Sequence, residues 1–247
     1  MSSTIDQKEI EKFSRIADEW WDESGKFKPL HKFNPIRISF IQRKISDIFP
    51  TIKNLKILDV GCGGGLIAEP FARMGADVTA IDAAEKNIAV AKIHAEKSAE
   101  KPRLKIDYRV ATAEEIAEEI IEEKFDVVFA LEIIEHVADV EQFVKSCAAL
   151  VKPNGLVFVA TMNRTLKSLA LAKIAVEYIL RWLPHGTHDW KKFLKPSELN
   201  FYAAKYGLEL QSLAGFSYNL LNDEWKESDD VDVNYAAVFR KVYTHST

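Results

Sequence analysis

A glycine-rich turn between a short apolar run and a predicted helix is the stretch of this sequence best suited to hold a ligand. Residues 56–60 are mostly apolar, and Gly61, Gly63, Gly64 and Gly65 follow them directly. Glycine permits positive φ in a tight turn and removes the Cβ atoms that would keep a ligand away from the main chain. We therefore expect a ligand to contact bare backbone at this turn.

Two acidic side chains near the turn indicate which ligand it binds. Asp82 ends the apolar run 77–81, where a carboxylate of a βαβ unit accepts hydrogen bonds from both ribose hydroxyls. Asp59 would repel a pyrophosphate, but it can accept a hydrogen bond from the ammonium group of S-adenosylmethionine (SAM). Leu66 stands where a dinucleotide fingerprint needs glycine and a phosphate-binding loop needs lysine. The pattern favours a SAM site over a purely structural turn.

Composition excludes several classes of protein. The net charge of −4 provides no basic field for nucleic acid, so we expect no nucleic-acid partner. Cys62 and Cys147 are the only cysteines, and Cys62 lies within the glycine turn, which favours a reducing compartment without disulfides. Residues 1–13 lack the apolar core of a signal peptide, and no run of membrane-spanning length is free of charge. We expect a cytoplasmic protein and leave peripheral attachment to the inner membrane open.

The elements that position these residues follow from a regular alternation after residue 55. Short apolar runs alternate with helical patterns, which predicts an α/β fold with a mostly parallel, doubly wound sheet. Ligands on such sheets bind at the carboxyl ends of the strands, where the glycine turn and Asp82 both lie. The predicted strands are 56–60, 77–81, 104–110, 125–130 and 156–161, and the predicted helices are 66–74, 84–98, 113–122 and 140–150.

Two predicted helices, 8–24 and 36–49, precede this core. Residues 28–35 between them read as a turn, because each of two prolines biases the residue before it away from the helix. The two helices either cover the sheet edge or form an N-terminal helical lid. In the lid, Arg37 at a helix start would face the carboxylate of the cofactor.

A predicted amphipathic helix, 165–183, forms a helical insertion after the fifth strand. Its broad apolar arc and basic side either pack on the same domain or meet an anionic membrane surface. A further helix and two strands, 208–217 and 233–242, then give the sheet an antiparallel end, with a loop around 222–226 between them. We therefore expect one domain, 1–247, made of a lid (1–50), a SAM-binding core (55–162), the insertion (163–195) and a C-terminal part (196–247).

The glycine turn with Asp59 and Asp82 resembles the Rossmann-like class I SAM-dependent methyltransferases. A more specific resemblance covers nearly the whole chain, which is similar to the ubiquinone biosynthesis O-methyltransferase family. The resemblance implies transfer of a methyl group from SAM to ring hydroxyls of polyprenylated phenols or catechols, at two steps that include 3-demethylubiquinol. The segments that carry it are 20–22, 27–31, 34–37, 90–95, 132–137, 177–181, 186–189 and 231–235.

The resemblance also assigns cofactor contacts. It places SAM against Arg37, Gly61, Asp82 and Leu131, to which the glycine motif adds Asp59 and Gly63. Many class I enzymes carry an acid for the adenine amine after the third strand, but this chain has residues 112–114, Thr-Ala-Glu. The main chain of Ala113 is the contact that we expect there.

Glu132, Glu135 and His136 are the candidates for chemistry. A phenol with a pKa of about 10 is mostly protonated at neutral pH, so its proton must be removed or its pKa lowered. Offsets of three and four would put the three side chains on one helical face, where they could hold Mg²⁺ or Zn²⁺ against catechol oxygens. The eukaryotic branch of the family is metal-dependent. Alternatively, His136 acts as general base beside Glu135 without a metal.

Two other functions remain open at this point. The first is a SAM-dependent enzyme for another small phenol or carboxylate in solution, and the second is a SAM-binding lipid carrier without turnover. The resemblance also leaves open an association with other ubiquinone biosynthesis enzymes.

Overall fold

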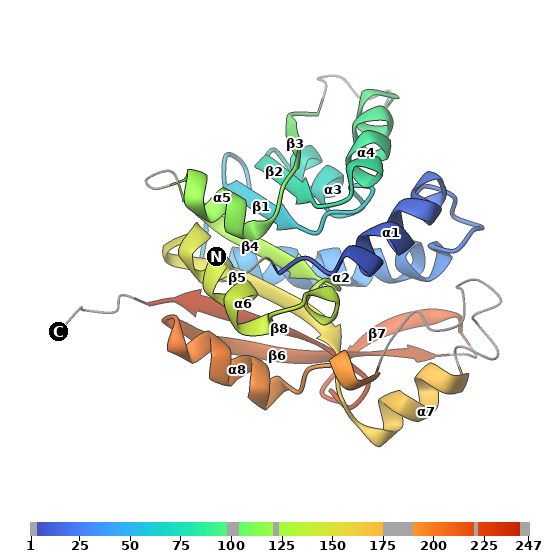
Figure 1. Ribbon diagram of the computed structural model, residues 1–247. Coiled ribbons are helices and arrows are strands. Elements are labelled where there is room, and N and C mark those ends of the chain that lie inside the picture. Colours follow the sequence, from blue (N-terminus) through green and yellow to red (C-terminus); the bar gives the residue numbers. More distant parts are fainter. Residues whose placement is uncertain (1–3, 98–103, 121–123, 175–189, 220–221, 243–247) are drawn as a thin grey trace.

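A twisted β-sheet runs through the protein, with helices on both of its faces (Figure 1). The computed structural model describes residues 4–97, 104–120, 124–174, 190–219 and 222–242. Within these ranges the sheet has eight strands in the order β3-β2-β1-β4-β5-β8-β6-β7. The strands are β1 (Lys56–Val60), β2 (Asp77–Asp82), β3 (Ile106–Val110), β4 (Phe125–Leu131), β5 (Val151–Met162), β6 (Leu208–Asn219), β7 (Glu224–Ser228) and β8 (Asn234–Lys241).

The first five strands pair in parallel, as the alternation predicted. In register, Val60 of β1 lies opposite Ile81 of β2 and Ala130 of β4. Leu131 at the end of β4 pairs with Ala160 of β5. The carboxyl ends of β1, β2, β4 and β5 therefore meet at one edge of the sheet, where ligands of doubly wound folds bind.

The other end of the sheet is antiparallel, which confirms the predicted change of direction, but it contains one more strand than expected. β8 lies between β5 and β6, and β6 pairs with β7. The segment around 222–226, which the sequence predicts to be a loop, contains the first residues of β7. Trp225 of this segment packs against Phe33, with ring centroids 4.8 Å apart, and Arg43 binds Glu227 at 2.6 Å. Tertiary contacts thus fix β7 as an edge strand.

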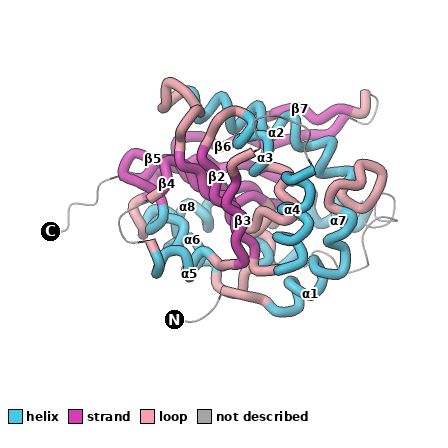
Figure 2. Tube along the Cα trace, turned by 90° about the horizontal axis from the view of Figure 1, so that it is seen from above, coloured by secondary structure: helices cyan, strands magenta, loops and turns pink. Residues whose placement is uncertain are grey.

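The helices divide between the two faces of the sheet. Figure 2 shows α5, α6 and α8 together on one side and α2 and α3 on the other. Neighbouring residues of each strand serve opposite faces, so that Ile57 packs with Phe40 and Phe71 on one face, while Leu58 packs with Ile116 and others on the opposite face. The helices are α3 (Ala68–Arg73), α4 (Glu85–Lys97), α5 (Ala113–Glu119), α6 (Val140–Leu150) and α8 (Pro196–Lys205).

The segment before β1 is more helical than the prolines suggested. Helix α1 (Gln7–Ile16) and the 3₁₀ turn η1 (Ala17–Glu19) are followed by α2 (Lys28–Ser46), which runs through Pro35. The predicted turn over 28–35 is therefore wrong. Pro29 lies in the first helical turn, where the missing N–H has no partner to lose. Burial of the α2 face that carries Phe33, Phe40 and Ile45 outweighs the cost of Pro35.

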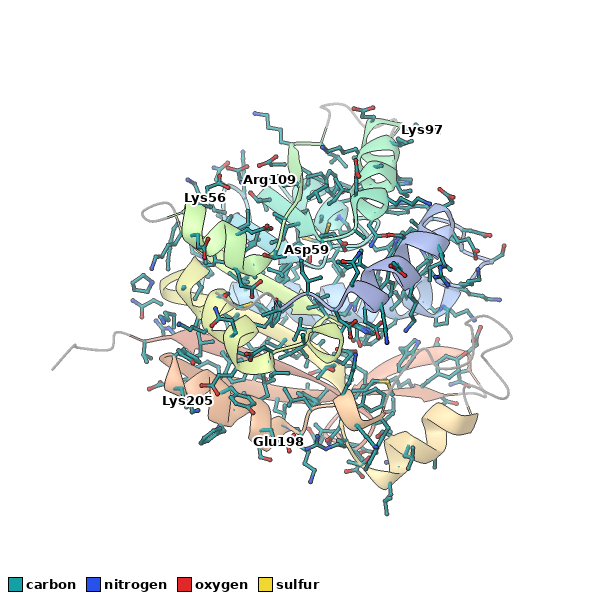
Figure 3. All side chains as sticks on the ribbon, viewed as in Figure 1. Lys56, Asp59, Lys97, Arg109, Glu198 and Lys205 are labelled. Atoms are coloured by element: carbon teal, nitrogen blue, oxygen red, sulfur yellow. The ribbon has the colours of Figure 1, made fainter. Side chains whose placement is uncertain are left out.

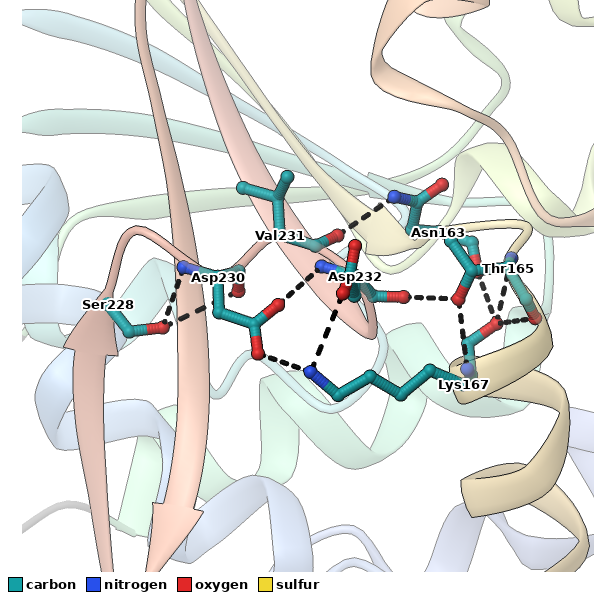
Figure 4. A network of polar contacts seen from close by, with 8 residues as sticks. Asn163, Thr165, Lys167, Ser228, Asp230, Val231 and Asp232 are labelled. Carbon is teal, nitrogen blue, oxygen red and sulfur yellow. Dashed lines mark hydrogen bonds and ion pairs between the residues drawn. The ribbon is translucent and has the colours of Figure 1, made fainter.

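The insertion after β5 begins with α7 (Leu166–Ile174). The rest of the predicted helix 165–183 lies outside the described residues. Figure 4 shows how the start of the insertion is fastened to the segment before β8: Asn163 donates to the Val231 carbonyl at 2.9 Å, and Lys167 forms ion pairs with Asp230 and Asp232. In the described part of the chain, no helix has both the length and the apolar character needed to cross a membrane.

Phe129 of β4 tests how much the core contributes to stability. Its ring is fully buried, with its centroid 4.9 Å from that of Phe71 and 5.6 Å from that of Phe158. We expect Phe129→Ala to lower the free energy of unfolding by about 3–5 kcal/mol, because the change leaves a cavity in a packed layer. Urea unfolding measures it. Leu210→Ala, at a side chain 41% exposed, is the control and should cost less than about 1 kcal/mol; equal losses would contradict this account.

Candidate active site

A cavity of about 590 Å³ lies at the carboxyl edge of the parallel strands. Its walls are largely apolar, and its size is that of a small-molecule site. The N-terminal helix α1 forms part of the wall through Glu9, Ile10 and Phe13. The cavity brings together all the residues predicted to contact SAM, namely Arg37, Asp59, Gly61, Gly63, Asp82, Ala113 and Leu131.

The glycine turn has a role that the sequence did not reveal. The faces of Gly63 and Gly64 that lack a Cβ meet the side chain of Trp20: a Cβ on Gly63 would lie 2.4 Å from the indole ring. A Cβ on Gly61 would meet Ile133 at 2.7 Å, and Gly61 and Gly63 have positive φ angles of 73° and 53°. Glycine is therefore required here for the bend and for the close packing of protein side chains.

Asp82 holds the turn in shape. Its carboxylate accepts hydrogen bonds from the backbone N–H groups of Gly63 at 2.9 Å and Ala84 at 2.8 Å, and from the Asn87 amide at 3.2 Å. Burial raises the pKa of this carboxyl. Asn87, which sequence reasoning missed, also accepts a hydrogen bond from the Trp20 indole at 2.9 Å. One carboxylate thus links the turn to the N-terminal segment.

The N-terminal segment covers the glycine turn, and its action as a lid stays a prediction. Trp21 donates to the Gly64 carbonyl at 2.9 Å and stacks on His94 with ring centroids 3.4 Å apart. Trp20 stacks on Phe27 at 3.9 Å. The aromatic side chains therefore pack η1 and the loop after it directly against the turn.

Arg37 and Asp59 provide opposite charges at one end of the cavity. Arg37 lies in the middle of α2, not at a helix start as expected, and its Nη1 is 3.9 Å from Glu132. The Arg37 and Asp59 side chains are buried, and burial raises the pKa of Asp59 to about 7 in spite of the nearby guanidinium. Asp59 lies in the interior of the molecule in Figure 3.

This end of the cavity fits the amino-acid part of SAM. Among the described residues, Asp59 Oδ2 and Arg37 Nε are buried polar atoms without a hydrogen-bond partner. A buried polar atom of this kind is costly unless a ligand or water satisfies it. An ammonium group suits the carboxylate oxygen, and a carboxylate suits the guanidinium.

Glu114 and Glu115, the acids after β3, are not among the described residues that line the cavity. Glu115 takes part in a capping box at the start of α5, where it accepts from the Thr112 N–H at 2.8 Å. Glu114 is buried and accepts from the Thr4 hydroxyl at 2.9 Å. Ala113 and Leu131 line the cavity, and their contact with the adenosine stays a prediction.

Glu132, Glu135 and His136 do not share a helical face. Glu132 has a left-handed backbone with φ of 56°, and the 3₁₀ turn η2 (Ile134–His136) follows it. The helix expected here is absent, because β4 ends in a tight loop: the Glu132 N–H donates to the Ala160 carbonyl at 2.8 Å. All three side chains nevertheless line the cavity.

The three side chains have distinct surroundings. Glu135 is buried and accepts from the Thr161 hydroxyl at 2.8 Å. Burial, with Glu135 nearby, raises the pKa of Glu132 to about 7. His136 Nδ1 is 3.2 Å from the carboxylate of Glu9, a residue that sequence reasoning missed and that no local signal connects to His136. The contact with His136 lowers the pKa of Glu9 to about 2.

Comparison with known proteins now decides the family. The ubiquinone biosynthesis O-methyltransferase of Pelagibacter ubique is 51% identical over 245 residues, which cover 97% of this chain and 99% of that protein. The protein of the same name from Brucella anthropi is 54% identical over 240 residues, 94% of each chain. This chain belongs to the ubiquinone biosynthesis O-methyltransferase family. It is therefore a SAM-dependent O-methyltransferase, as the resemblance predicted.

Further comparisons agree with the fold of this methyltransferase. Residues 58–159 match the family model described as a methyltransferase domain. The magnesium protoporphyrin IX methyltransferase of Synechocystis, solved with bound SAH, has a TM-score of 0.61 at 16% identity and covers 83% of this chain and 82% of its own. A SAM-dependent methyltransferase from Thermotoga maritima has the same TM-score at 15% identity, with 94% and 99% covered.

Asp59 should make the affinity of this methyltransferase for its cofactor depend on pH. With a pKa of about 7, the carboxyl is mostly protonated at pH 6 and mostly ionised at pH 7.5. An ammonium group favours the ionised form, so affinity for S-adenosylhomocysteine should rise about 8-fold between these pH values. Calorimetry on the wild type and on Asp59→Asn measures it. The wild-type affinity divided by the affinity of Asp59→Asn at the same pH removes the contribution of Glu132, which titrates in the same range. A value of this ratio that does not change with pH would contradict the contact between Asp59 and the ammonium group.

Proposed function

We propose that this chain methylates a ring hydroxyl of polyprenylated phenol or catechol intermediates at two steps of ubiquinone biosynthesis, including 3-demethylubiquinol. His136 is the proposed general base. The observation that carries the proposal is a shared cavity: the glycine turn with Asp82 and the pair Glu135 and His136 line the same space. Methyl donor and proton acceptor can therefore meet one substrate.

Removal of the phenol proton is the step for which the chain must provide a group. At pH 7, about one in a thousand molecules of a phenol with pKa ~10 is ionised. SAM supplies a methyl group on a positively charged sulfur. His136 takes the hydroxyl proton as the phenol oxygen forms its bond to the methyl carbon, while the carbon–sulfur bond breaks and its electrons stay on sulfur. Glu135, which accepts from the Thr161 hydroxyl at 2.8 Å, is the second proposed catalytic group.

The walls of the cavity support an apolar substrate. Ile10 and Phe13 from α1, together with Ile133, Val137 and Phe143, line the same cavity as His136. Burial of apolar surface favours a hydrocarbon by about 25 cal/mol per Å². A cavity of about 590 Å³ that also holds SAM is too small for a whole polyprenyl tail, so most of the tail must extend out of the cavity.

A metal at Glu132, Glu135 and His136 stays a prediction. Among the described residues, no three His, Cys, Asp or Glu side chains are placed to hold a metal ion together, and this includes Glu132, Glu135 and His136. The donors present do not fit a cation as they stand, since Glu135 is engaged with Thr161 and His136 with Glu9.

An anionic membrane surface is the proposed source of the substrate. Leu166 at the start of α7 is 79% exposed, which suits contact with lipid. Two of the basic side chains nearby are already in ion pairs and so are less available to bind anionic headgroups: Arg164 pairs with Glu198, and Lys192 pairs with Asp6. Apolar contact through α7 therefore supports the proposal more strongly than charge. Association with other ubiquinone biosynthesis enzymes stays a prediction.

Methylation of a short-prenyl catechol tests the function. We expect turnover by the wild type and a loss of at least about 100-fold in kcat for His136→Ala, because a positioned base contributes 10²–10⁴-fold. Affinity for S-adenosylhomocysteine should persist in the variant. Full activity of His136→Ala would exclude the base, and wild-type activity lost on exhaustive EDTA treatment and restored by Mg²⁺ or Zn²⁺ would establish the cation.

Flotation with vesicles that contain anionic lipid tests the membrane contact. We expect Leu166→Glu to reduce the bound fraction several-fold, because a carboxylate is costly in the lipid interface and is repelled by anionic headgroups. Ile93→Glu is the matched control, since Ile93 is 51% exposed on α4, far from α7 in Figure 1. Equal binding by both variants, with cofactor affinity retained, would exclude α7 as the contact.

A further inference from the structure

We propose that Glu9 is a positioning residue for His136, so that the N-terminal lid supplies part of the catalytic apparatus when it closes. Glu9 lies on α1, whereas His136 lies in η2 after β4. The Oε2 atom of Glu9 is 3.2 Å from Nδ1 of His136. The inference rests on the proposed role of His136 as base.

The surroundings of this pair keep it in a defined geometry. Phe13, one turn further along α1, packs edge-on against the imidazole with ring centroids 5.1 Å apart. The backbone N–H of His136 donates to the Ile133 carbonyl at 2.9 Å, which fixes the backbone of the turn. His136 is 8% exposed, so its ring is held between the lid and the cavity.

Two lysines hold Glu9 in place. Lys12, three residues along α1, is 3.2 Å from Glu9 Oε2, and Lys192 is 3.6 Å from Oε1. Lys192 also binds Asp6, the residue that caps the start of α1. The carboxylate of Glu9 is thus directed at His136 from a helix that is anchored at its first turn. This arrangement differs from that of a freely rotating surface acid.

The contact selects one form of the imidazole. A carboxylate accepts from an N–H group, so Glu9 favours the tautomer with the proton on Nδ1 and the lone pair on Nε2. Nε2 is then the atom that takes the phenol proton, and the carboxylate stabilises the imidazolium that forms. No atom is transferred to Glu9. Partners of this kind, which orient a reactive imidazole, change activity without touching the substrate.

The position of Glu9 on α1 links catalysis to closure of the lid. The same segment closes over the glycine turn through Trp20 and Trp21, and its Thr4 carbonyl accepts from the Ala138 N–H at 2.8 Å, two residues after His136. A lid that moves away to admit substrate takes Glu9 with it. The base is therefore fully oriented only when donor and acceptor are enclosed, which limits proton transfer to the closed cavity.

Glu9→Gln tests the inference through the catalytic rate. We expect kcat for a short-prenyl catechol to fall about 10–100-fold, while KM for the catechol and affinity for S-adenosylhomocysteine change less than about 2-fold. Glu11→Gln is the matched control on the same helix, where Glu11 is exposed and pairs with Arg15 at 3.8 Å. If Glu9 only stabilised the position of the N-terminal segment, Glu9→Gln would instead raise KM or weaken cofactor binding.

Two further measurements separate positioning from structure and from failure of the proposed function. In the His136→Ala background, Glu9→Gln should cause no additional loss, because Glu9 acts through the imidazole. Nitrogen-15 NMR of His136 should report the Nδ1–H tautomer in the wild type and a mixture of tautomers in Glu9→Gln, and it needs no turnover. Unchanged kcat in Glu9→Gln, an additive loss in the double variant, or an unchanged His136 spectrum would each overturn the inference, whereas an inactive wild type would contradict only the proposed function.

Discussion

The carboxylate of Asp82 is the constraint on which the rest of the site depends. It binds the N–H groups of Gly63 and Ala84 and the amide of Asn87, which in turn holds the indole of Trp20. Hydrogen bonds to an ionised acceptor are the stronger kind, and burial makes their loss expensive. The same group therefore fixes the end of β2, the shape of the glycine turn and the position of the lid.

The N-terminal segment closes one side of the cavity at the carboxyl edge of the sheet. Side chains of α1 and Trp20, which follows η1, line this wall; Trp20 packs against Gly63 and Gly64, and Glu9 lies against His136. Exclusion of water strengthens every charge interaction inside and protects a reactive donor. Because the glycine turn follows β1 and His136 follows β4, the two groups come from separate strand ends, and the N-terminal segment contacts both through Trp20 and Glu9.

The parallel half of the fold and the gathering of the predicted cofactor contacts at one cavity were predictable from the sequence, because their signals are local. A strand, a glycine turn and an acid at the next strand end specify their own geometry. The prediction failed where packing overrides local preference: α2 continues through Pro35 because its apolar face is buried, and β7 forms because Trp225 and Glu227 find partners on α2. Such contacts join residues far apart in the chain and leave no pattern along it.

The sequence by itself determined the fold class, the family and a set of predicted cofactor contacts that line one cavity, since each rests on residue type and short spacing. The tertiary structure alone decided that the glycines accommodate Trp20, that Glu132 to His136 form a left-handed residue and a 3₁₀ turn, and that Glu9 faces His136. The physical reason is the separation along the chain of the residues that interact. Spacing reports neighbours along one element, whereas the partner of a buried charge is whichever group the folded chain places beside it.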